Sequence, residues 1–360
     1  MTTERRRRLK ALLKARRLTT MLITSAVDVA YLSGFTGEDS FLLLTRGADY
    51  LITDGRFTEQ VAKECPRLKA VIRKGPMAEA VAGVIHRRKI RSLAFDADYL
   101  TVAAGNRLGK ALGRGVRLRP VTDMVSKLRQ IKDAGEVRAV CRAIKIAEDA
   151  FRRLVPWIKT GRSEREIAAR LEWLMLSLGA DKPAFKTIVA VGPRASLPHA
   201  SPTSRRLPKR GGLILIDWGA MVDGYVSDLT RVLFAGKIPS LVKHVHEIVC
   251  RAQAEAIKAM RPGADLKAVD SAARLILKDE GYEKAFVHGT GHGIGREVHE
   301  PPPAAPRSRG KMQVGMVITA EPGVYLPGKF GIRVEDDVLV TGSGCRVLSH
   351  LKKGPWIVRV

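Results

Sequence analysis

The first third of the chain alternates between two patterns of apolar and polar residues. A basic helix over about 4–17 is followed by a strand in TTMLIT, a short helix near Ser25–Leu32 and a hairpin-like pair, FLLLTRG and DYLITDG. Further helical and strand patterns continue to VRLRPVTDMV. Such alternation is typical of a small α/β domain, in which helices cover a sheet.

A longer periodic segment follows. It begins in KLRQIKDAGEVRA and runs to about Ile158, with apolar residues three and four positions apart, which predicts a long helix. We therefore place a boundary near residues 123–133. The expected domains are an N-terminal domain, 1–128, and a second domain, 129–360.

The second domain contains a repeated pattern. The segments TGRSEREIAARLEWLMLSLG and PGADLKAVDSAARLILKDEG each predict an amphipathic helix between two glycines with the same spacing. Ser163 and Asp265 occupy matching N-cap positions, and Glu166 completes a capping box in the first copy. The repeat is either a coincidence of common helix signals or the mark of a pseudo-symmetric fold with a site between its halves.

Composition indicates a globular protein. Hydrophobic residues make up 45% and charged residues 28%, enough for a substantial core. No apolar run approaches the roughly 20 residues of a membrane span, so we expect no membrane association. The N-terminus lacks the apolar segment of a secretory signal, and the 4 cysteines form no CxxC pair. Both features favour a reduced, cytoplasmic setting.

The formal net charge of +27 raises the question of a nucleic-acid partner. The basic clusters Arg5–Arg8, Arg205–Arg210 and Arg307–Lys311 lie far apart in the sequence and contain no aromatic residues that could stack on bases. We therefore interpret the charge as a solvated basic surface and do not expect nucleic acid as a partner.

Two aspartates occur in apolar strands where a core alone would place apolar residues. Asp217 lies in LILIDWG and Asp228 in GYVSDLTRVLF, with the turn signal VDG between them. A two-residue turn at Val222–Asp223 would place the aspartates directly opposite each other, and one at Asp223–Gly224 would place them diagonally. Either turn puts both carboxylates on one face of the sheet. The structural alternative is a pair held by an arginine such as Arg231.

Three further segments carry polar groups of the same kind. His292 lies in HGTGHGIG, whose glycine density argues against a helix, so His288 and His292 are not a helical zinc pair. We expect the glycines to let backbone and imidazole approach a crowded site. Glu321 follows the apolar strand MVIT, and Glu335 lies in the predicted strand IRVEDDVLV on the same face as Arg333.

These groups together predict a metal site. Four carboxylates cannot be buried close together unless cations neutralise them, and two divalent ions would do so. Carboxylate oxygens with one imidazole suit manganese, cobalt, zinc or iron, and the ligand types do not give an order among these ions, although manganese is our expectation. Two such ions would activate a water for hydrolysis, and a glutamate beside them could carry its proton to a leaving amine.

The chain closely resembles the pita-bread metallopeptidases, the family of Xaa-Pro aminopeptidases and Xaa-Pro dipeptidases (prolidases). YLSGFTG and DYLITDGRFTEQV are similar to the creatinase-type N-terminal domain of that family. FKTIVAVGPRASLPHASPT, DWGAMVDGYVSDLTR, HGTGHGIGREVHEPP, ITAEPGVY and GIRVEDDVLVT match the successive signatures of its catalytic domain in order. The resemblance implies an α/β (α+β) fold in which a pseudo-symmetric pita-bread domain follows a small α/β domain.

The resemblance also implies roles for individual residues. His199 would line the substrate site, while His288 and His299 would hold the scissile carbonyl and its tetrahedral intermediate. Glu321 would act as proton shuttle, and Arg333 would support the site. The two metal ions would be held by five residues: Asp217, Asp228, His292, Glu321 and Glu335.

The resemblance implies hydrolysis of the bond before proline in peptides by an Xaa-Pro aminopeptidase, with an Xaa-Pro dipeptidase as the alternative. It also implies a homodimer. A dipeptidase must recognise the free carboxylate next to proline, a task that suits arginine, here Arg296 or Arg333. Arg296 and Pro301–Pro303 depart from the usual family pattern and put substrate length in question. A hypothesis of another class is a non-catalytic module that binds nucleic acid or protein on the same fold.

Overall fold

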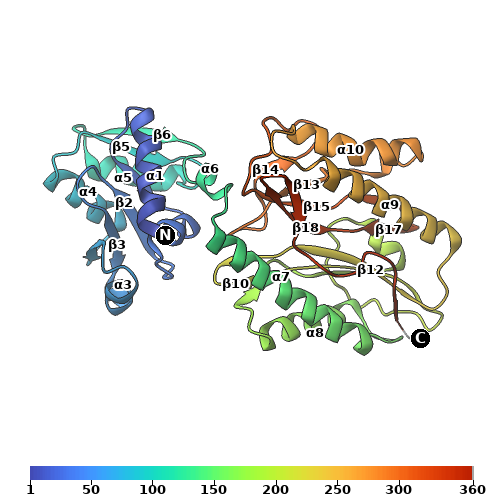
Figure 1. The fold of residues 1–360 in the computed structure, drawn as a ribbon. Coiled ribbons are helices and arrows are strands. Elements are labelled where there is room, and N and C mark those ends of the chain that lie inside the picture. The colour runs from blue at the N-terminus through green and yellow to red at the C-terminus, as the bar shows by residue number, and fades with distance from the viewer. Residues whose placement is uncertain (359–360) are drawn as a thin grey trace. The chain divides into compact units, whose positions relative to one another are not determined.

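The computed structural model describes residues 1–358, and the chain divides into two compact units, Met1–Arg129 and Gln130–Val360 (Figure 1). Among the residues described, no helix is both long and apolar enough to cross a membrane. Each unit is built around its own sheets and its own hydrophobic core.

The first unit is a mixed sheet with helices on both faces. Its strand order is β4-β3-β2-β1-β5-β6, and the predicted hairpin is the antiparallel pair β2–β3. The strands are β1 (Met21–Ile23), β2 (Ser40–Leu44), β3 (Tyr50–Asp54), β4 (Lys69–Arg73), β5 (Ser92–Asp96) and β6 (Arg117–Val121). The helices are α1 (Thr2–Ala15), α2 (Ala26–Ser33), α3 (Thr58–Glu64), α4 (Met77–Arg87), α5 (Val102–Leu112) and α6 (Ser126–Arg129).

Alternating apolar residues of this sheet are buried on opposite faces. Leu42 and Leu44 pack in a cluster with residues of α1 and α2, whereas Leu43 packs with residues of α4 and α5. Because successive side chains of a strand point to opposite faces, a strand covered on both sides reads as a continuous apolar run. FLLLT is such a run.

The second unit consists of two similar halves. In each half a pair of helices precedes three antiparallel strands: α7 (Ala134–Leu154) and α8 (Glu164–Ser177) with β8-β9-β12, then α9 (Ser240–Ala259) and α10 (Leu266–Asp279) with β13-β15-β18. The first set of strands is β8 (Ile188–Val191), β9 (Gly212–Trp218) and β12 (Leu229–Ala235), and the second is β13 (Gly291–Gly293), β15 (Val317–Ala320) and β18 (Asp336–Thr341). The others are β7 (Lys182–Pro183), β10 (Ala220–Val222), β11 (Tyr225–Val226), β14 (Glu300–Ala304), β16 (Gly323–Leu326), β17 (Phe330–Arg333), β19 (Gly344–Val347) and β20 (Trp356–Val358).

The repeat seen in the sequence corresponds to these halves. Ser163 caps α8, and its capping box with Glu166 is formed as predicted. Asp265 occupies the N-cap position of α10, but its side chain makes no capping hydrogen bond. Each N-cap residue also forms an isolated antiparallel bridge at an equivalent place, Ser163 with Arg206 and Asp265 with Lys311. The pseudo-symmetric interpretation of the repeat is therefore confirmed.

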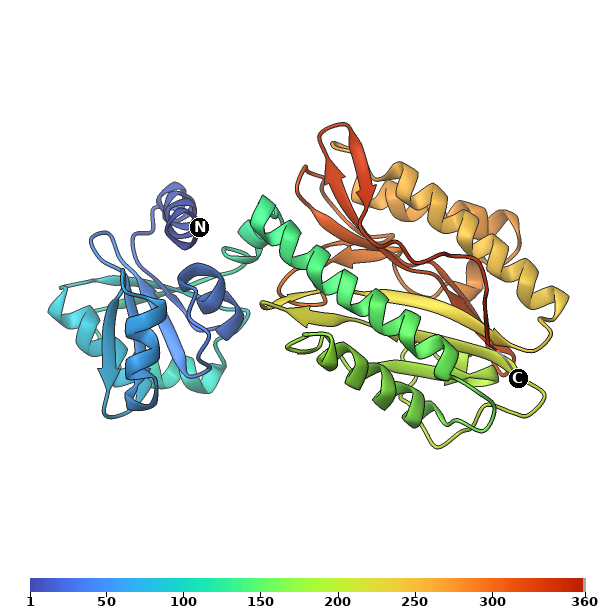
Figure 2. The same cartoon turned by 60° about the horizontal axis from the view of Figure 1, so that its bottom comes forward.

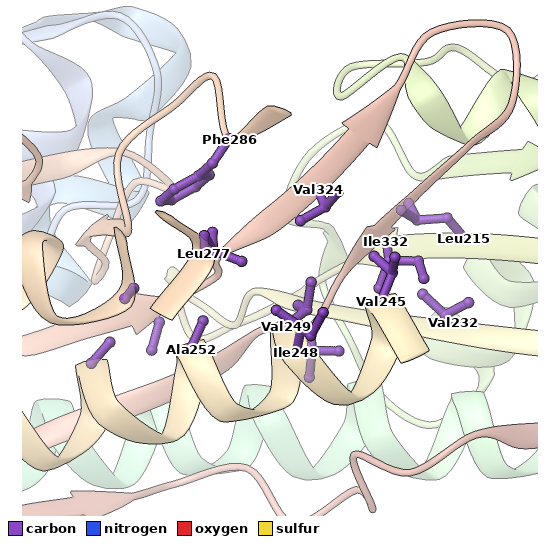
Figure 3. Close-up of a cluster of buried hydrophobic side chains, with 14 of the residues drawn as sticks. Leu215, Val232, Val245, Ile248, Val249, Ala252, Leu277, Phe286, Val324 and Ile332 are labelled. Atoms are coloured by element: carbon purple, nitrogen blue, oxygen red, sulfur yellow. The ribbon is translucent and has the colours of Figure 1, made fainter. Parts of the chain in front are cut away.

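Helix pairs cover the strands from both sides. Figure 1 shows α9 and α10 on one side of the strands and α7 and α8 on the other, and Figure 2 shows α7 running along them. Val245 and Val249 of α9 pack against Leu215 and Val232 of the first half and Ile332 of the second (Figure 3). The two halves thus share one core, which holds their strand ends in fixed positions.

The long helix is shorter than the sequence pattern indicated. It begins after Asp133, whose side chain accepts from the backbone N–H of Glu136, and Ser126–Arg129 forms a separate short helix, α6. At the other end α7 stops at Leu154, and a 3₁₀ segment containing Pro156 follows. Proline has no N–H for the helical ladder, which explains why the regular helix ends there.

Candidate metal centre

Asp217 and Asp228 are positioned by one long hairpin. Its turn is Asp223–Gly224, both with positive φ (53° and 71°), and strand pairing places Asp217 opposite Thr230. Asp228 precedes Thr230 by two residues, so the aspartates lie diagonally on one face, the second of the two predicted arrangements. Both carboxylates are buried.

The glycines around His292 are explained by close approaches of backbone. A Cβ on Gly291 would lie 1.9 Å from the carbonyl oxygen of Thr319, and one on Gly293 would lie 2.6 Å from that of Pro301. His292 itself sits in strand β13, not in a helix, as predicted. Its Nδ1 lies 3.2 Å from the carbonyl oxygen of Gly293, which favours a proton on Nδ1 and leaves the Nε2 lone pair for a ligand.

Glu335 lies between two strands rather than inside one. Strand β17 ends at Arg333 and β18 begins at Asp336, so the single strand expected for IRVEDDVLV is wrong. The chain leaves the β16–β17 ribbon at this point and pairs with β15. Both residues of the connection, Val334 and Glu335, are buried, so the sequence reads as one continuous strand although the strand is interrupted there.

The predicted ligand residues converge. Ligand atoms of Asp228, His292 and Glu335 all lie within 4.8 Å of one another. His292 Nε2 lies 3.2 Å from Glu321 Oε1 and 3.7 Å from Asp228 Oδ2. Asp217 stands in the same cavity, where its Oδ2 accepts from Arg333 Nη2 at 2.5 Å.

Two carboxylate oxygens of this cluster lack partners. Asp217 Oδ1 and Glu335 Oε1 are buried and make no hydrogen bond with any residue of the described chain. Their other oxygens are held, in the case of Glu335 by the hydroxyl of Thr230 at 2.6 Å. An unpaired buried carboxylate oxygen is costly unless a cation meets it. The residues therefore fit divalent metal ions.

The charges of the cluster oppose one another when no cation is present. Burial, reinforced by Glu335 and Asp217, raises the pKa of Asp228 well above its usual range. Burial and the charges of Glu321 and Asp217 do the same to the pKa of Glu335. For Glu321 burial is outweighed by the hydrogen bond and charge of His292, which lower its pKa to about 2. A site that crowds carboxylates in this way attracts cations.

The other predicted residues line the same cavity, which has a volume of about 520 Å³. His199, His288 and His299 are in its wall, together with Arg333 and the five predicted ligands. The His299 ring packs edge-on against that of His292, with 4.3 Å between their centroids. All nine residues proposed from the sequence are thus brought to one cavity.

Tyr325 is a further polar residue beside the site, and the sequence analysis did not identify it. Its hydroxyl lies 2.8 Å from His288 Nε2 and accepts from Arg333 Nη1 at 2.7 Å, so it links the histidine to the arginine that holds Asp217. Burial raises its pKa to about 12, which keeps the phenol protonated. The segment VYLPG reads as an apolar strand end, and nothing in it marks the tyrosine as polar in function.

Two arginines that the sequence suggested for the site, Arg231 and Arg296, lie outside it. Arg231 does not hold the aspartate pair: its Nη2 donates to Asp336 Oδ1 at 2.6 Å. Arg296 does not line the cavity, because its guanidinium lies over the ring of Tyr225, 5.2 Å from the centroid. Arg333 is the arginine that reaches the site.

Comparison with known proteins identifies the family. The model of metallopeptidase family M24 matches residues 138–342, and that of the creatinase/prolidase N-terminal domain matches residues 5–131. The chain is 37% identical over 333 residues to the uncharacterized peptidase YqhT of Bacillus subtilis. The alignment covers 92% of this chain and 94% of that protein.

Solved structures agree with this assignment. An Xaa-Pro dipeptidase from Bacillus anthracis superposes with a TM-score of 0.96 at 32% identity, covering 99% of this chain and 100% of that one. An X-Pro aminopeptidase from Thermotoga maritima superposes with a TM-score of 0.91 at 36% identity, covering 98% and 99%. The chain belongs to metallopeptidase family M24 and combines a pita-bread catalytic fold with a creatinase-type N-terminal domain.

Proposed function

We propose that this metallopeptidase hydrolyses the peptide bond before proline, acting as an Xaa-Pro aminopeptidase. The observation that carries the proposal is the convergence of four carboxylates, three of them buried, and one imidazole in a single cavity, with two carboxylate oxygens unpaired. Asp217, Asp228, His292, Glu321 and Glu335 would hold two divalent ions, manganese first among the candidates. Such ions, when bound, would lower the pKa of a water molecule and polarise the scissile carbonyl.

The residues around the ligands have separate tasks. Glu321, whose Oε1 lies beside His292 in the cavity, would take the proton of the attacking water and pass it to the leaving amine. His288 and His299 would hold the carbonyl oxygen as its charge grows, and His199 would position the substrate. Tyr325 fixes the ring of His288 through its hydroxyl.

The cavity also suits the substrate. Its wall includes apolar side chains, Phe185, Ile188, Val298, Pro303 and Ala305, against which a pyrrolidine ring can pack. The bond before proline is a tertiary amide without an N–H, so a site for it must recognise shape rather than that donor. Similarity to proteins named for Xaa-Pro substrates supports the same specificity.

Xaa-Pro dipeptidase remains the second candidate, favoured by the likeness to the dipeptidase of Bacillus anthracis. A non-catalytic module is not proposed, because the chain belongs to a metallopeptidase family. We further propose that the protein is a homodimer, which light scattering on the purified protein would test. We also propose a cytoplasmic location, which fractionation of cells that produce the protein would test.

The activity is tested with purified protein, added manganese and short Xaa-Pro peptides. We expect hydrolysis before proline and its loss in Asp217→Ala. Asp223→Asn is the matched control, because Asp223 lies in the turn of the same hairpin, is exposed and pairs with Arg142, and asparagine tolerates the positive φ of this position. Equal activity in Asp217→Ala and Asp223→Asn would refute the ligand assignment.

A further inference from the structure

The wall of the catalytic cavity carries two side chains that are always cationic at neutral pH, Arg333 and Lys186. Arg333 is buried and already committed: it donates to Asp217, Tyr325 and Thr230. It therefore has a structural task within the site and little capacity left for a substrate.

Lys186, in contrast to Arg333, is neither buried nor fully committed to other residues of the protein. It lies just before β8, is exposed, and its Nζ donates to the hydroxyl of Ser201 at 3.2 Å. In residues 1–358 no acidic side chain forms an ion pair with it. An ammonium group has three N–H donors, so two remain for a ligand.

The surroundings of Lys186 indicate the chemistry of that ligand. Its neighbours in the wall, Phe185 and Ile188, are apolar, and they contribute no acceptor that would satisfy the ammonium. Two divalent ions would cancel the negative charges of the four carboxylates. The charge that remains available to a substrate in this part of the wall is then positive, and a carboxylate is the anionic group that peptides carry.

We propose that Lys186 forms a carboxylate-binding subsite of this cavity and selects peptides with a negative charge near the scissile bond. The inference rests on the proposed peptidase function and adds a substrate class to it. The carboxylate has two possible sources in a peptide: the C-terminus on the proline side, or an Asp or Glu side chain before proline.

Four peptides separate these sources: Ala-Pro-Ala, its C-terminal amide, Glu-Pro-Ala amide and Gln-Pro-Ala amide. The first two peptides differ only in the charge of the C-terminus, and the last two differ only in the charge of the side chain before proline. In the pair whose carboxylate Lys186 binds, wild-type protein should prefer the charged peptide by about fivefold in kcat/KM, through a lower KM. Lys186→Met should abolish that preference, whereas Lys186→Arg should retain most of it. Added salt should weaken it, since the lysine is exposed.

Lys182→Met is the matched control, because Lys182 is an exposed lysine four residues earlier that does not line the cavity. It should leave all four values unchanged. If Lys186→Met affects charged and neutral peptides equally, or if wild-type protein prefers neither charged peptide, the proposal is overturned.

Calorimetric binding of uncleavable analogues of the same peptides, with the scissile carbonyl reduced to a methylene, to manganese-loaded protein gives a readout that does not depend on cleavage. Lys186→Met should weaken binding of the preferred charged peptide about fivefold and leave its neutral partner unchanged. Absence of cleavage with a preserved charge preference in binding would contradict the proposed function alone. Cleavage without any charge preference would contradict the lysine subsite alone.

Discussion

Replacing Glu335 with glutamine should have opposite effects on stability with and without metal. Glu335 is 1% exposed, and one of its oxygens has no hydrogen-bond partner in the described residues. In metal-free protein the substitution removes one of several buried charges that repel one another. In metal-loaded protein it removes a proposed ligand.

The magnitude follows from the distances. Ligand atoms of Glu335 and Asp228 lie within 4.8 Å of each other, so two full charges would repel by at least about 3.5 kcal/mol at an effective dielectric constant of about 20. Burial and neighbouring charges raise the pKa of Glu335 well above its usual range, so proton uptake already relieves part of this repulsion. We expect a gain of about 1–2 kcal/mol, or about 2–8 °C in melting temperature, for metal-free Glu335→Gln.

In the presence of manganese, Glu335→Gln should be less stable than the wild-type protein. An ion at a hundred times its dissociation constant stabilises the folded state by about 2.7 kcal/mol, and the variant should lose much of that gain. Calorimetric melting in EDTA and in manganese measures both differences.

Glu164→Gln is the control for this pair of measurements. Glu164 is equally buried, but its oxygens accept from the backbone N–H groups of Val191 at 2.9 Å and Thr203 at 2.8 Å. Its replacement should destabilise the protein by the same amount in both conditions. If Glu335→Gln also lowers the melting temperature in EDTA, Glu335 is a structural hydrogen-bond acceptor and the electrostatic reasoning is refuted.

Three further predictions concern other parts of the chain. Tyr325→Phe removes the hydroxyl that fixes His288, so kcat should fall about tenfold while metal content stays unchanged; a lost metal ion would contradict this role. Gly291→Ala would place a methyl group against the carbonyl of Thr319 and should destabilise the protein by about 3 kcal/mol in urea unfolding, which an unchanged midpoint would exclude. Burial raises the pKa of Asp96 to about 6, so the folded state binds this proton more tightly than the unfolded state and gains stability as pH falls through 6 toward 4. Asp96→Asn should therefore be more stable than wild type at pH 7.5, and the difference should shrink at pH 5; a constant difference would refute the assignment.

Much of the candidate metal centre could be predicted because its residues break a local rule. Asp217, Asp228 and Glu335 are acids within apolar segments, and the glycines around His292 exclude a helix. Each departure from a simple core pattern marks a position that the fold must satisfy by some other means. The hairpin turn even limited the geometry of the aspartates to two arrangements, of which the structure adopts the diagonal one.

The parts that were not predicted depend on contacts distant in sequence. Tyr325 resembles a core residue until its hydroxyl is seen beside His288, 37 positions away. Arg231 and Asp336 pair across 105 positions, which nothing in either strand indicates. Lys186 stands in a segment that matches the family pattern, yet only the cavity wall distinguishes it from the many other exposed lysines.

The central claim, that two divalent ions hold these side chains together, is tested most directly by anomalous diffraction from crystals of the protein soaked in manganese. We predict two manganese peaks among Asp217, Asp228, His292, Glu321 and Glu335, and fewer in Asp217→Ala. Well-ordered side chains at these positions without any manganese peak at saturating concentration would contradict the account.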